Sequence, residues 1–329
     1  RWDTMGKFLD RAGGERKTEF IEVLRTTASD STSSCERWLV SDPSGDARAA
    51  WVTRLQGATL RVPFLRVLPD ELGPTIARLL SFHLRQIAVE SCCTSVEFVD
   101  PHASRAWLAE LESDGYTQTG SGWVAQVTQA IGPWDQFEAT AGVQPGVMPP
   151  TDEVAEIERV RWPVRLLGAG IPNYLVPIRG TRSADLLGYP VTLDSRPDFL
   201  GLSREHVYYK AAGGVRLRAP GRILWFASFD PQEVVGCSRL IETITGAPNN
   251  LHRRFSKYGV YSAADVRGAA SQQSGLVEVL RFADTEIFRT PVTLDRVNRL
   301  VASHSKSPNL VLRSASAIDD ELFEMIYRE

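Results

Sequence analysis

Arginine and aromatic side chains alternate with glycine turns along one stretch of the chain, from Arg204 to Tyr261. Between Arg204 and Lys257 there are nine lysines and arginines but only four acids, so this stretch has a net charge of +5. The whole chain of 329 residues carries −3. Cations neutralise phosphates, and aromatic rings stack on bases at about 1–3 kcal/mol each. The pattern predicts a surface for a polyanion, with nucleic acid as the leading candidate.

The candidate nucleic-acid contacts are Arg216, Arg218, Arg222, Arg253, Arg254, Lys257, Tyr208 and Trp225. The first three flank a Gly/Pro turn and are expected to be exposed, and the next three lie within one or two helical turns of each other. Each of the two aromatic residues adjoins another one, and neighbours on a strand face opposite ways, so one of each pair is expected in the core. Each of these residues also has a simpler interpretation. An aromatic side chain can be explained by packing in the core, and an arginine by a solvated or ion-paired position at the surface.

Composition sets the broad class. With 43% apolar and 23% charged residues the chain should fold fully, and its length favours two domains. Apolar runs fall short of the roughly 18 residues that span a bilayer, so no membrane association is expected. Four cysteines without a CxxC pair and five scattered histidines predict free thiols, a reducing cytoplasm and no metal site. The chain begins Arg1-Trp2-Asp3 without methionine, which is compatible with an excised or processed form.

Hydrophobic periodicity divides the chain into two blocks. The first block is predicted to contain a helix at 2–28, strands at 37–40, 49–55 and 59–67, a helix at 73–90, a strand at 94–99, a helix at 104–113 capped by Gly115, and a strand at 123–127. The second is predicted to contain strands at 174–178, 206–209, 222–229, 234–241 and 275–282, with helices near 250–257, 294–300 and 319–327. A Gly- and Pro-rich run at 144–150 marks the connection. We predict domains at 1–131 and 172–329, joined by a linker at 132–171.

The element order of the first block resembles that of the GNAT acyltransferases, most specifically from Leu65 to Leu80 and at Ser113-Asp114-Gly115-Tyr116. The resemblance implies an α/β domain in which N–H groups at a helix start bind the pyrophosphate of acetyl-CoA. It assigns acetyl-CoA contacts to Val67, Leu72, Gly73, Thr75 and Ile76.

The loop before that helix departs from the GNAT pattern. Asp70 stands where Gln or Arg is usual, Thr75 replaces a small residue, and Pro74 has no N–H to donate. Two interpretations stay open, a scaffold without acetyl-CoA and a competent site. The candidates for proton transfer are Glu36, Glu97 and Tyr116, although solvated acids and core packing explain these residues equally well.

The second block is similar to the PUA-like superfamily, which includes the ASCH and EVE domains. The similarity lies in Pro172–Ile178, Val207–Tyr209, Gly221–Phe226 and Phe282–Phe288, while the ASCH Gly-x-Lys-x-x-Glu-x-Arg signature is absent. The resemblance implies an α+β domain built on a β-barrel, with RNA or a modified base as ligand. The two resemblances together are similar to fusions of GNAT and ASCH domains, some of which carry a nuclease domain upstream. They imply an upstream nuclease domain or a protein partner for this chain.

The two resemblances and the cationic segment predict a protein that binds RNA or a modified nucleotide and carries a GNAT-like domain. The alternative is an acetyl-CoA-dependent N-acetyltransferase that acts on tRNA or protein. A third possibility is an interaction module of a toxin–antitoxin or defence system.

Overall fold

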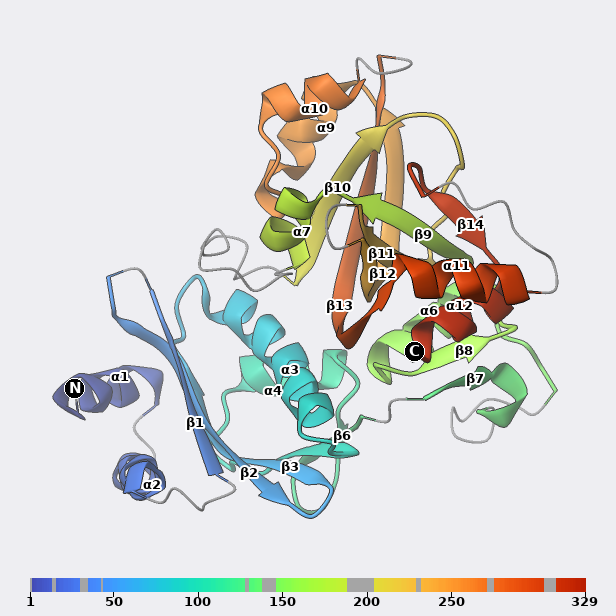
Figure 1. Ribbon diagram of the computed structural model, residues 1–329. Coiled ribbons are helices and arrows are strands. Elements are labelled where there is room, and N and C mark those ends of the chain that lie inside the picture. Colours follow the sequence, from blue (N-terminus) through green and yellow to red (C-terminus); the bar gives the residue numbers. More distant parts are fainter. Residues whose placement is uncertain are drawn as a thin grey trace. The chain divides into compact units, whose positions relative to one another are not determined.

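The computed structural model describes residues 2–13, 16–29, 35–42, 44–127, 130–137, 146–187, 204–228, 232–270, 275–304 and 312–329. The chain forms two compact units. Unit 1 comprises Arg1–Ala130 and Glu158–Val164, and unit 2 comprises Ile131–Ile157 and Arg165–Glu329. Each unit contains a six-stranded mixed sheet with helices, so the fold is mixed α/β (Figure 1). In the described part of the chain, no helix is both long enough and apolar enough to cross a membrane.

Unit 1 follows the predicted order of elements. They are α1 (Trp2–Ala12), α2 (Lys17–Ser29), β1 (Cys35–Ser41), β2 (Ala47–Gln56), β3 (Thr59–Val67), α3 (Gly73–Glu90), β4 (Ser95–Phe98), α4 (Arg105–Ser113), β5 (Thr117–Gln118) and β6 (Trp123–Gln126). The strands lie in the order β1-β2-β3-β4-β6-β5. Among the described strands of this sheet, β3 and β4 alone pair in parallel, and α3 is the crossover that such a pair requires. The single helix expected at 2–28 is two helices.

Helices cover both faces of this sheet. Phe8 of α1 and Phe20 of α2 pack on Val52 and Phe64, which lie on one face. Trp51, the neighbour of Val52, faces the other way and contacts His83 of α3. The apolar stripe of α3 consists of Ile76, Leu80, Leu84 and Ile87, all buried. The sheet therefore holds α3 against the face opposite α1 and α2 (Figure 1).

Gly115 ends α4 in the way that the sequence predicted. It has a left-handed backbone with φ of 82°, its N–H donates to the Glu112 carbonyl, and the Tyr116 N–H donates to the Leu111 carbonyl. These two bonds define a Schellman cap. A Cβ at position 115 would lie 2.5 Å from the Cβ of Val160, in the segment that returns to unit 1. Both the backbone angle and the close packing therefore require glycine here.

Unit 2 contains a two-stranded and a six-stranded sheet. Its elements are β7 (Ile131–Pro133), η1 (Trp134–Gln136), α6 (Thr151–Val160, ending in unit 1), β8 (Arg165–Leu167), β9 (Asn173–Ile178), α7 (Gly180–Leu187), β10 (Glu205–Ala211), β11 (Gly221–Ala227), β12 (Glu233–Gly246), α9 (Pro248–Phe255), η2 (Ser256–Tyr258), α10 (Ala263–Ala270), β13 (Val277–Thr293), α11 (Leu294–Ser303), β14 (Ser316–Ile318) and α12 (Asp320–Tyr327). The segment 132–171, expected as a linker, thus carries most of β7, η1, α6 and β8.

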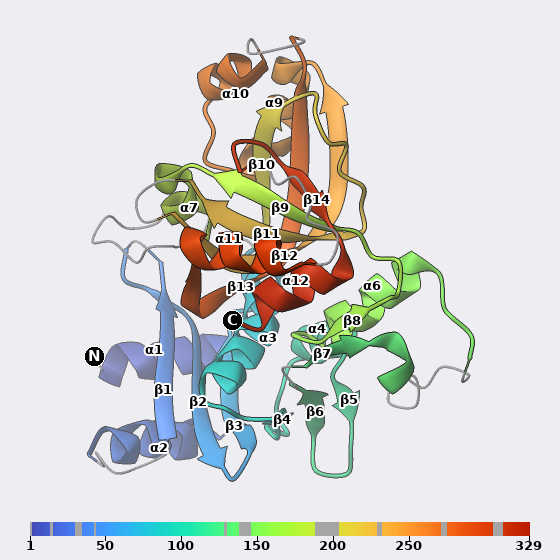
Figure 2. The same ribbon diagram turned by 45° about the vertical axis from the view of Figure 1, so that its right-hand side comes forward.

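The large sheet of unit 2 has the order β10-β13-β12-β11-β9-β14 and is mixed, because β9 and β11 pair in parallel (Figure 2). The strand expected at 275–282 extends to Thr293 as β13 and pairs with β12 along its length. In the described segments β10 and β14 end the strand order, so closure into a barrel stays a prediction.

Strand β11 is buried on both faces. Trp225 packs with Ile223 and Phe282 on one side, and Phe226 packs with Val297 and Phe323 on the other. The expectation that one residue of this aromatic pair would face a ligand is wrong. A second layer, formed by α11 and α12, covers the face that alternation alone assigns to solvent.

The Schellman cap gives a test of packing in unit 1. Gly57 also has a left-handed backbone, with φ of 59°, but nothing lies within 4 Å of the Cβ that alanine would add there. We expect Gly57→Ala to cost only the backbone strain, about 1–2 kcal/mol of unfolding free energy. Gly115→Ala should cost a further 1–3 kcal/mol, roughly the usual penalty of overpacking. Urea unfolding measures both, and equal losses would contradict the close contact with Val160.

Candidate functional site

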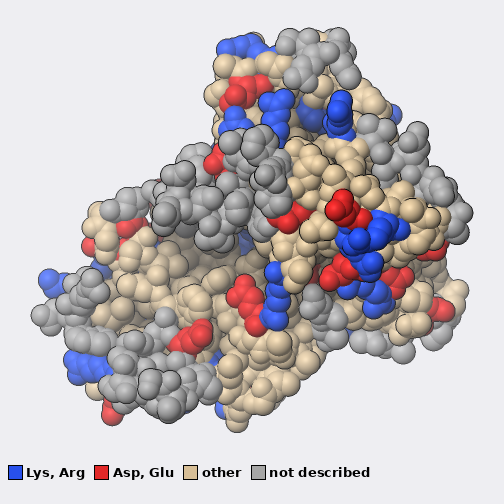
Figure 3. Space-filling view, in the orientation of Figure 1, with Lys and Arg blue, Asp and Glu red and all other residues tan. Residues whose placement is uncertain are grey.

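One group of exposed positive charge in unit 2 lies on α9, η2 and α10. Residues 248–270, which we call the α9–α10 surface, carry four exposed cations and a single acid, Asp265. The cations are Arg253, Arg254, Lys257 and Arg267. Figure 3 shows basic side chains with an acidic one among them over this region, at the top of the view. The first three were predicted contacts, whereas Arg267 lies beyond the segment that the sequence singled out.

The amphipathic pattern of α9 turns its cations outward. Pro248 occupies the first turn, where a missing N–H costs nothing. Leu251 and Phe255, four residues apart, are buried against Val279 of β13, so Arg253 and Arg254 between them face solvent. This packing fixes the helix on the sheet and exposes its charged side.

The cations of α9 differ in how far they are already paired. The Arg254 guanidinium lies 3.1 Å from a Glu242 oxygen but keeps 57% of its side chain exposed. An exposed pair of this kind contributes little and is readily exchanged for another anion. Arg253 and Lys257 pair with no acid among the residues that the structure describes. A ligand would therefore meet these two cations without breaking an ion pair in the described residues.

Of the two half-buried tyrosines in this segment, Tyr261 packs on Tyr208 and Tyr209, and Tyr258 lies beside the cations. It is half-buried, the Lys257 ammonium lies 4.8 Å from its ring centre, and the Arg281 guanidinium lies 5.7 Å from it. Both distances fall within the range of cation–π attraction. Sequence reasoning did not select Tyr258, although its position next to Lys257 was a usable signal.

The turn cations Arg216 and Arg218 are exposed, as predicted. The turn is anchored to β12, because the Thr243 hydroxyl donates to the Leu217 carbonyl at 3.2 Å. The next residue along β12, Glu242, contacts Arg254 of α9. Since adjacent strand side chains face opposite ways, the turn and α9 lie on opposite faces of β12. The structure therefore does not gather the predicted cations on one face.

The expected exposure of Arg222 is wrong, because its side chain is 2% exposed. The guanidinium donates to the Asn173 side-chain oxygen at 2.8 Å and to the Leu166 carbonyl at 2.7 Å, and it lies over the Phe323 ring. Arg222 sits in the doubly covered strand β11, so its charge is used inside the fold. It ties β11 to β8 and β9 rather than meeting a ligand.

Trp225 and Tyr208 also serve the core. Trp225 is fully buried, and its indole N–H donates to the Ser238 hydroxyl at 2.8 Å. The Tyr208 hydroxyl donates to the Pro177 carbonyl at 3.0 Å. Burial disfavours the phenolate and raises the pKa of Tyr208 to about 12. The Tyr208 side chain is half-buried and packs against this core, so both rings are engaged inside the fold.

The GNAT resemblance places the pyrophosphate at the loop before α3. In this loop the backbone binds the carboxylate of Asp70 instead. The Leu72 N–H donates to the Asp70 carboxylate at 3.1 Å, and the Gly73 N–H donates to the Asp70 carbonyl at 3.0 Å. The other Asp70 oxygen accepts from Arg48 at 2.7 Å. An internal anion therefore occupies donors that an anionic ligand would need.

The expected acetyl-CoA residues have different surroundings. Val67 is half-buried, Leu72 and Thr75 are exposed, and Gly73 and Ile76 are buried. A Cβ on Gly73 would lie 2.6 Å from the Leu68 carbonyl oxygen, so close packing of the loop explains this glycine. Their role in binding stays a prediction.

A second carboxylate fills the place where the parallel strands part. The last paired residues are Val62 of β3 and Phe98 of β4. Beyond them the Leu65 N–H donates to the Asp100 carboxylate at 3.2 Å, and Arg66 forms a buried ion pair with the same oxygen. Any group inserted between the strand ends here would disrupt a buried charge pair, which is costly.

The three candidates for proton transfer lie on different elements. Glu36 is exposed on β1, while Glu97 on β4 accepts from the Ser121 hydroxyl at 2.7 Å and lies 3.3 Å from Arg61. The buried Tyr116 donates its hydroxyl to the Ser81 carbonyl at 3.0 Å. Cross-strand register places Glu36 opposite Thr53 and Glu97 opposite Arg61, so the two acids occupy different strand pairs. Their catalytic roles stay predictions.

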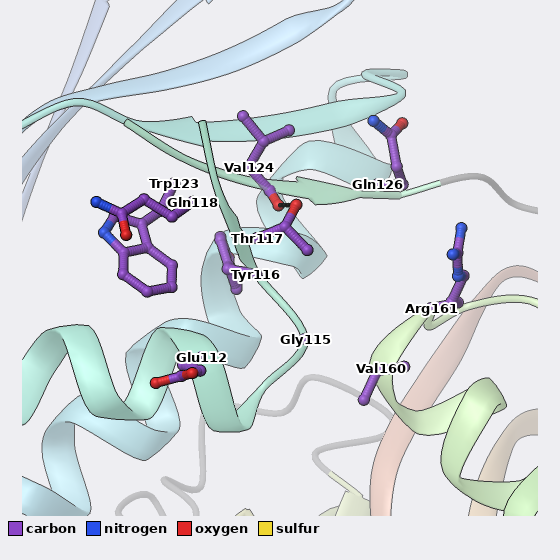
Figure 4. Close-up of a pocket in the computed structure, with 10 residues that line it drawn as sticks. All are labelled: Glu112, Gly115, Tyr116, Thr117, Gln118, Trp123, Val124, Gln126, Val160 and Arg161. Carbon is purple, nitrogen blue, oxygen red and sulfur yellow. Dashed lines mark hydrogen bonds between the residues drawn. The ribbon is translucent and has the colours of Figure 1, made fainter. Parts of the chain in front are cut away.

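A pocket of about 540 Å³ lies elsewhere in unit 1 (Figure 4). Its walls are the β5–β6 hairpin, the end of α4 and the segment at Val160–Arg161. Polar side chains line it without hydrogen-bond partners in the described part of the chain, namely Glu112, Gln118, Gln126 and Arg161. Tyr116 beside it contacts Ser81, about two turns along α3 from Gly73. The pocket is thus separate from the loop that holds Asp70.

Metal-ligating side chains come together at one place in the described residues. His304, Asp319 and Glu321 each offer one ligand atom, and these atoms lie within 4.8 Å of one another. The expectation of no metal rested on sequence spacing, which does not show this set, because 15 residues separate His304 from Asp319.

Solved structures of both predicted kinds match parts of the chain. An ASCH structure from Zymomonas mobilis matches at 15% identity over 47% of this chain and 94% of that chain, with a TM-score of 0.36. The ribosomal-protein-S18-alanine N-acetyltransferase from Escherichia coli matches at 17% over 32% and 77%, with a TM-score of 0.27. The aminoglycoside 6′-N-acetyltransferase from Enterococcus faecium matches at 10% over 39% and 91%, with a TM-score of 0.31. No protein-family model and no curated protein matches the chain.

The buried role of Arg222 predicts an effect on stability. Arg222→Met leaves the Asn173 oxygen and the Leu166 carbonyl without this donor, which should cost about 1–3 kcal/mol for each acceptor. The exposed Arg218→Met is the matched control and should change the unfolding free energy by less than about 0.5 kcal/mol. Denaturant unfolding compares them, and a neutral Arg222→Met would show that the guanidinium is not committed to the fold.

The self-occupied loop predicts weak or absent acetyl-CoA binding. We expect no measurable heat when acetyl-CoA is titrated into the unchanged protein. Asp70→Ala frees the Leu72 N–H and should bind detectably, while Arg48 keeps its ion pair with Asp42. The control Glu71→Gln removes a neighbouring negative charge and should behave like the unchanged protein. Micromolar binding by the unchanged protein would contradict the occlusion by Asp70.

Proposed function

We propose that this protein binds single-stranded RNA through the α9–α10 surface, and that unit 1 is a GNAT-like scaffold without acetyltransferase activity. The observation that carries the proposal is the group of exposed cations on α9, η2 and α10, two of which pair with no acid in the described residues. Phosphate neutralisation by such cations supplies most of the sequence-independent affinity for nucleic acid.

The arrangement around Tyr258 favours a single strand over a duplex. An aromatic ring next to cations provides a stacking face for an unpaired base, and the cations beside it meet the adjoining phosphates. Arg216 and Arg218, on the opposite face of β12, offer a second cationic group. An RNA strand bound at the α9–α10 surface would have to pass around the sheet to contact Arg216 and Arg218 as well.

Carboxylates of unit 1 already occupy two backbone N–H donors, and one of these bears on the acetyltransferase alternative. Asp70 occupies the N–H donor of Leu72, and Asp100 occupies that of Leu65. Of the two, Asp70 stands at the helix start where the GNAT resemblance places the pyrophosphate of acetyl-CoA, so it competes with that anion for a donor. Acyl transfer to tRNA or protein is therefore the less favoured function, and the acetyl-CoA titration distinguishes the two.

Charge reversal of the two unpaired cations tests the RNA interface. We expect Arg253→Glu with Lys257→Glu to weaken binding of a short fluorescent single-stranded RNA at least about tenfold. The salt dependence of log K should also become shallower by about 0.7 for each lost phosphate contact. Fluorescence anisotropy at several salt concentrations measures both quantities.

The control variant reverses two other exposed arginines of unit 2, Arg299→Glu with Arg313→Glu. Its net charge change is the same, so general electrostatic attraction is held constant. Unchanged affinity and slope in the α9–α10 variant, or equal losses in both variants, would refute a specific interface.

A further inference from the structure

We propose that His304, Asp319 and Glu321 form a binding site for a divalent transition-metal ion, with zinc as the best chemical fit. The site lies in unit 2, where α11 ends and α12 begins (Figure 2). His304 follows the last residue of α11, Asp319 is the N-cap of α12, and Glu321 lies in its first turn.

The separations of the ligand atoms suit a single ion. The His304 Nε2 lies 2.9 Å from an Asp319 oxygen and 3.5 Å from a Glu321 oxygen. All three ligand atoms fall within 4.8 Å of one another. Ligands at zinc bond lengths of about 2.0–2.2 Å stand roughly 3–4 Å apart in tetrahedral geometry. Only small side-chain movements would therefore bring the three atoms around one ion.

The site is rigid on one side and open on the other. The His304 side chain is fully buried, so its ring has a fixed direction, whereas Asp319 and Glu321 are 34% and 55% exposed. Asp319 is also held by the Leu322 N–H at 3.0 Å, which orients its carboxylate. An ion could enter from solvent, and water would complete its coordination.

The donor set selects the class of ion. Calcium and magnesium prefer sites made of oxygen donors, whereas imidazole suits zinc and its neighbours among the transition metals. Two carboxylates carry two negative charges and would neutralise a dication beside a neutral imidazole. Nε2 must then be the unprotonated ring nitrogen, so binding releases or relocates its proton.

The simpler interpretation is a hydrogen bond from His304 to the N-cap carboxylate, without metal. The N-terminus of α12 also opposes a nearby cation, by about 0.3–1 kcal/mol. That cost is small against the attraction of two carboxylates. Glu321 places a second carboxylate oxygen 3.5 Å from the His304 Nε2, which offers an ion a third ligand.

A bound ion would stabilise unit 2. It would tie the end of α11 to the start of α12, and both helices pack on one hydrophobic cluster through Val297 and Phe323. An ion that binds only the folded state raises the free energy of unfolding by RT ln(1 + [L]/Kd), where [L] is the concentration of free ion. The metal site would thus have a structural role, independent of RNA binding.

Zinc titration of the tag-free full chain tests the site. Calorimetry with zinc chloride should show one ion bound per chain, and the melting temperature should rise. Glu321→Gln keeps the His304–Asp319 bond and should weaken zinc binding at least about tenfold and abolish the thermal shift. His304→Gln should do the same. Glu324→Gln is the matched control on α12, because Glu324 pairs with Arg328 instead, and should bind like the unchanged protein.

A cobalt(II) absorption spectrum keeps the test decisive if His304→Gln fails to fold. The unchanged protein should show visible bands of nitrogen and oxygen ligation, and these should change in Glu321→Gln but not in Glu324→Gln. Absence of zinc binding in the unchanged protein would overturn the proposal. Equal binding by all variants, as expected for zinc held at the exposed thiol of Cys92, would overturn it too.

Discussion

A buried guanidinium must find acceptors for its donors, and this requirement decides how the structure uses its arginines. In unit 1, Arg85 donates to the carbonyls of Val160 and Asp114, and Arg66 pairs with Asp100. In unit 2, Arg165 pairs with Glu286, and Arg222 donates to Asn173 and Leu166. These residues join strands and loops far apart in sequence, so their charge belongs to the fold.

Only some of the cations between Arg204 and Lys257 remain exposed at the surface. Arg204 and Arg239 both bind the buried Asp284, and although burial opposes its ionisation, their charges and hydrogen bonds lower the pKa of that carboxyl to about 2. Lys210 pairs with Glu278. The cations left exposed between Arg204 and Lys257 are Arg216, Arg218, Arg253, Arg254 and Lys257. The net charge of +5 thus reduces to two small groups on opposite faces of β12.

Sequence patterns predicted the local secondary structure well. They predicted poorly which side chains are buried and which distant residues meet. The helix at 73–90 and the left-handed cap at Gly115 follow from periodicity and backbone preference, which are local properties. The burial of Arg222 and Trp225 depends on a second layer of helices that no local pattern reveals. Asp70 was recognised as a departure from the family pattern, but its bond to the Leu72 N–H needed coordinates. The meeting of His304 with Asp319 likewise depends on how α11 and α12 pack.

We propose that exposed cations without an internal ion pair mark the surface of this protein that binds RNA. Ultraviolet crosslinking of the full chain to single-stranded RNA, followed by mass spectrometry of the crosslinked peptides, tests it directly. We expect crosslinks in residues 248–270, above all at Tyr258. Crosslinks concentrated at the start of α3, or spread evenly over both units, would contradict it.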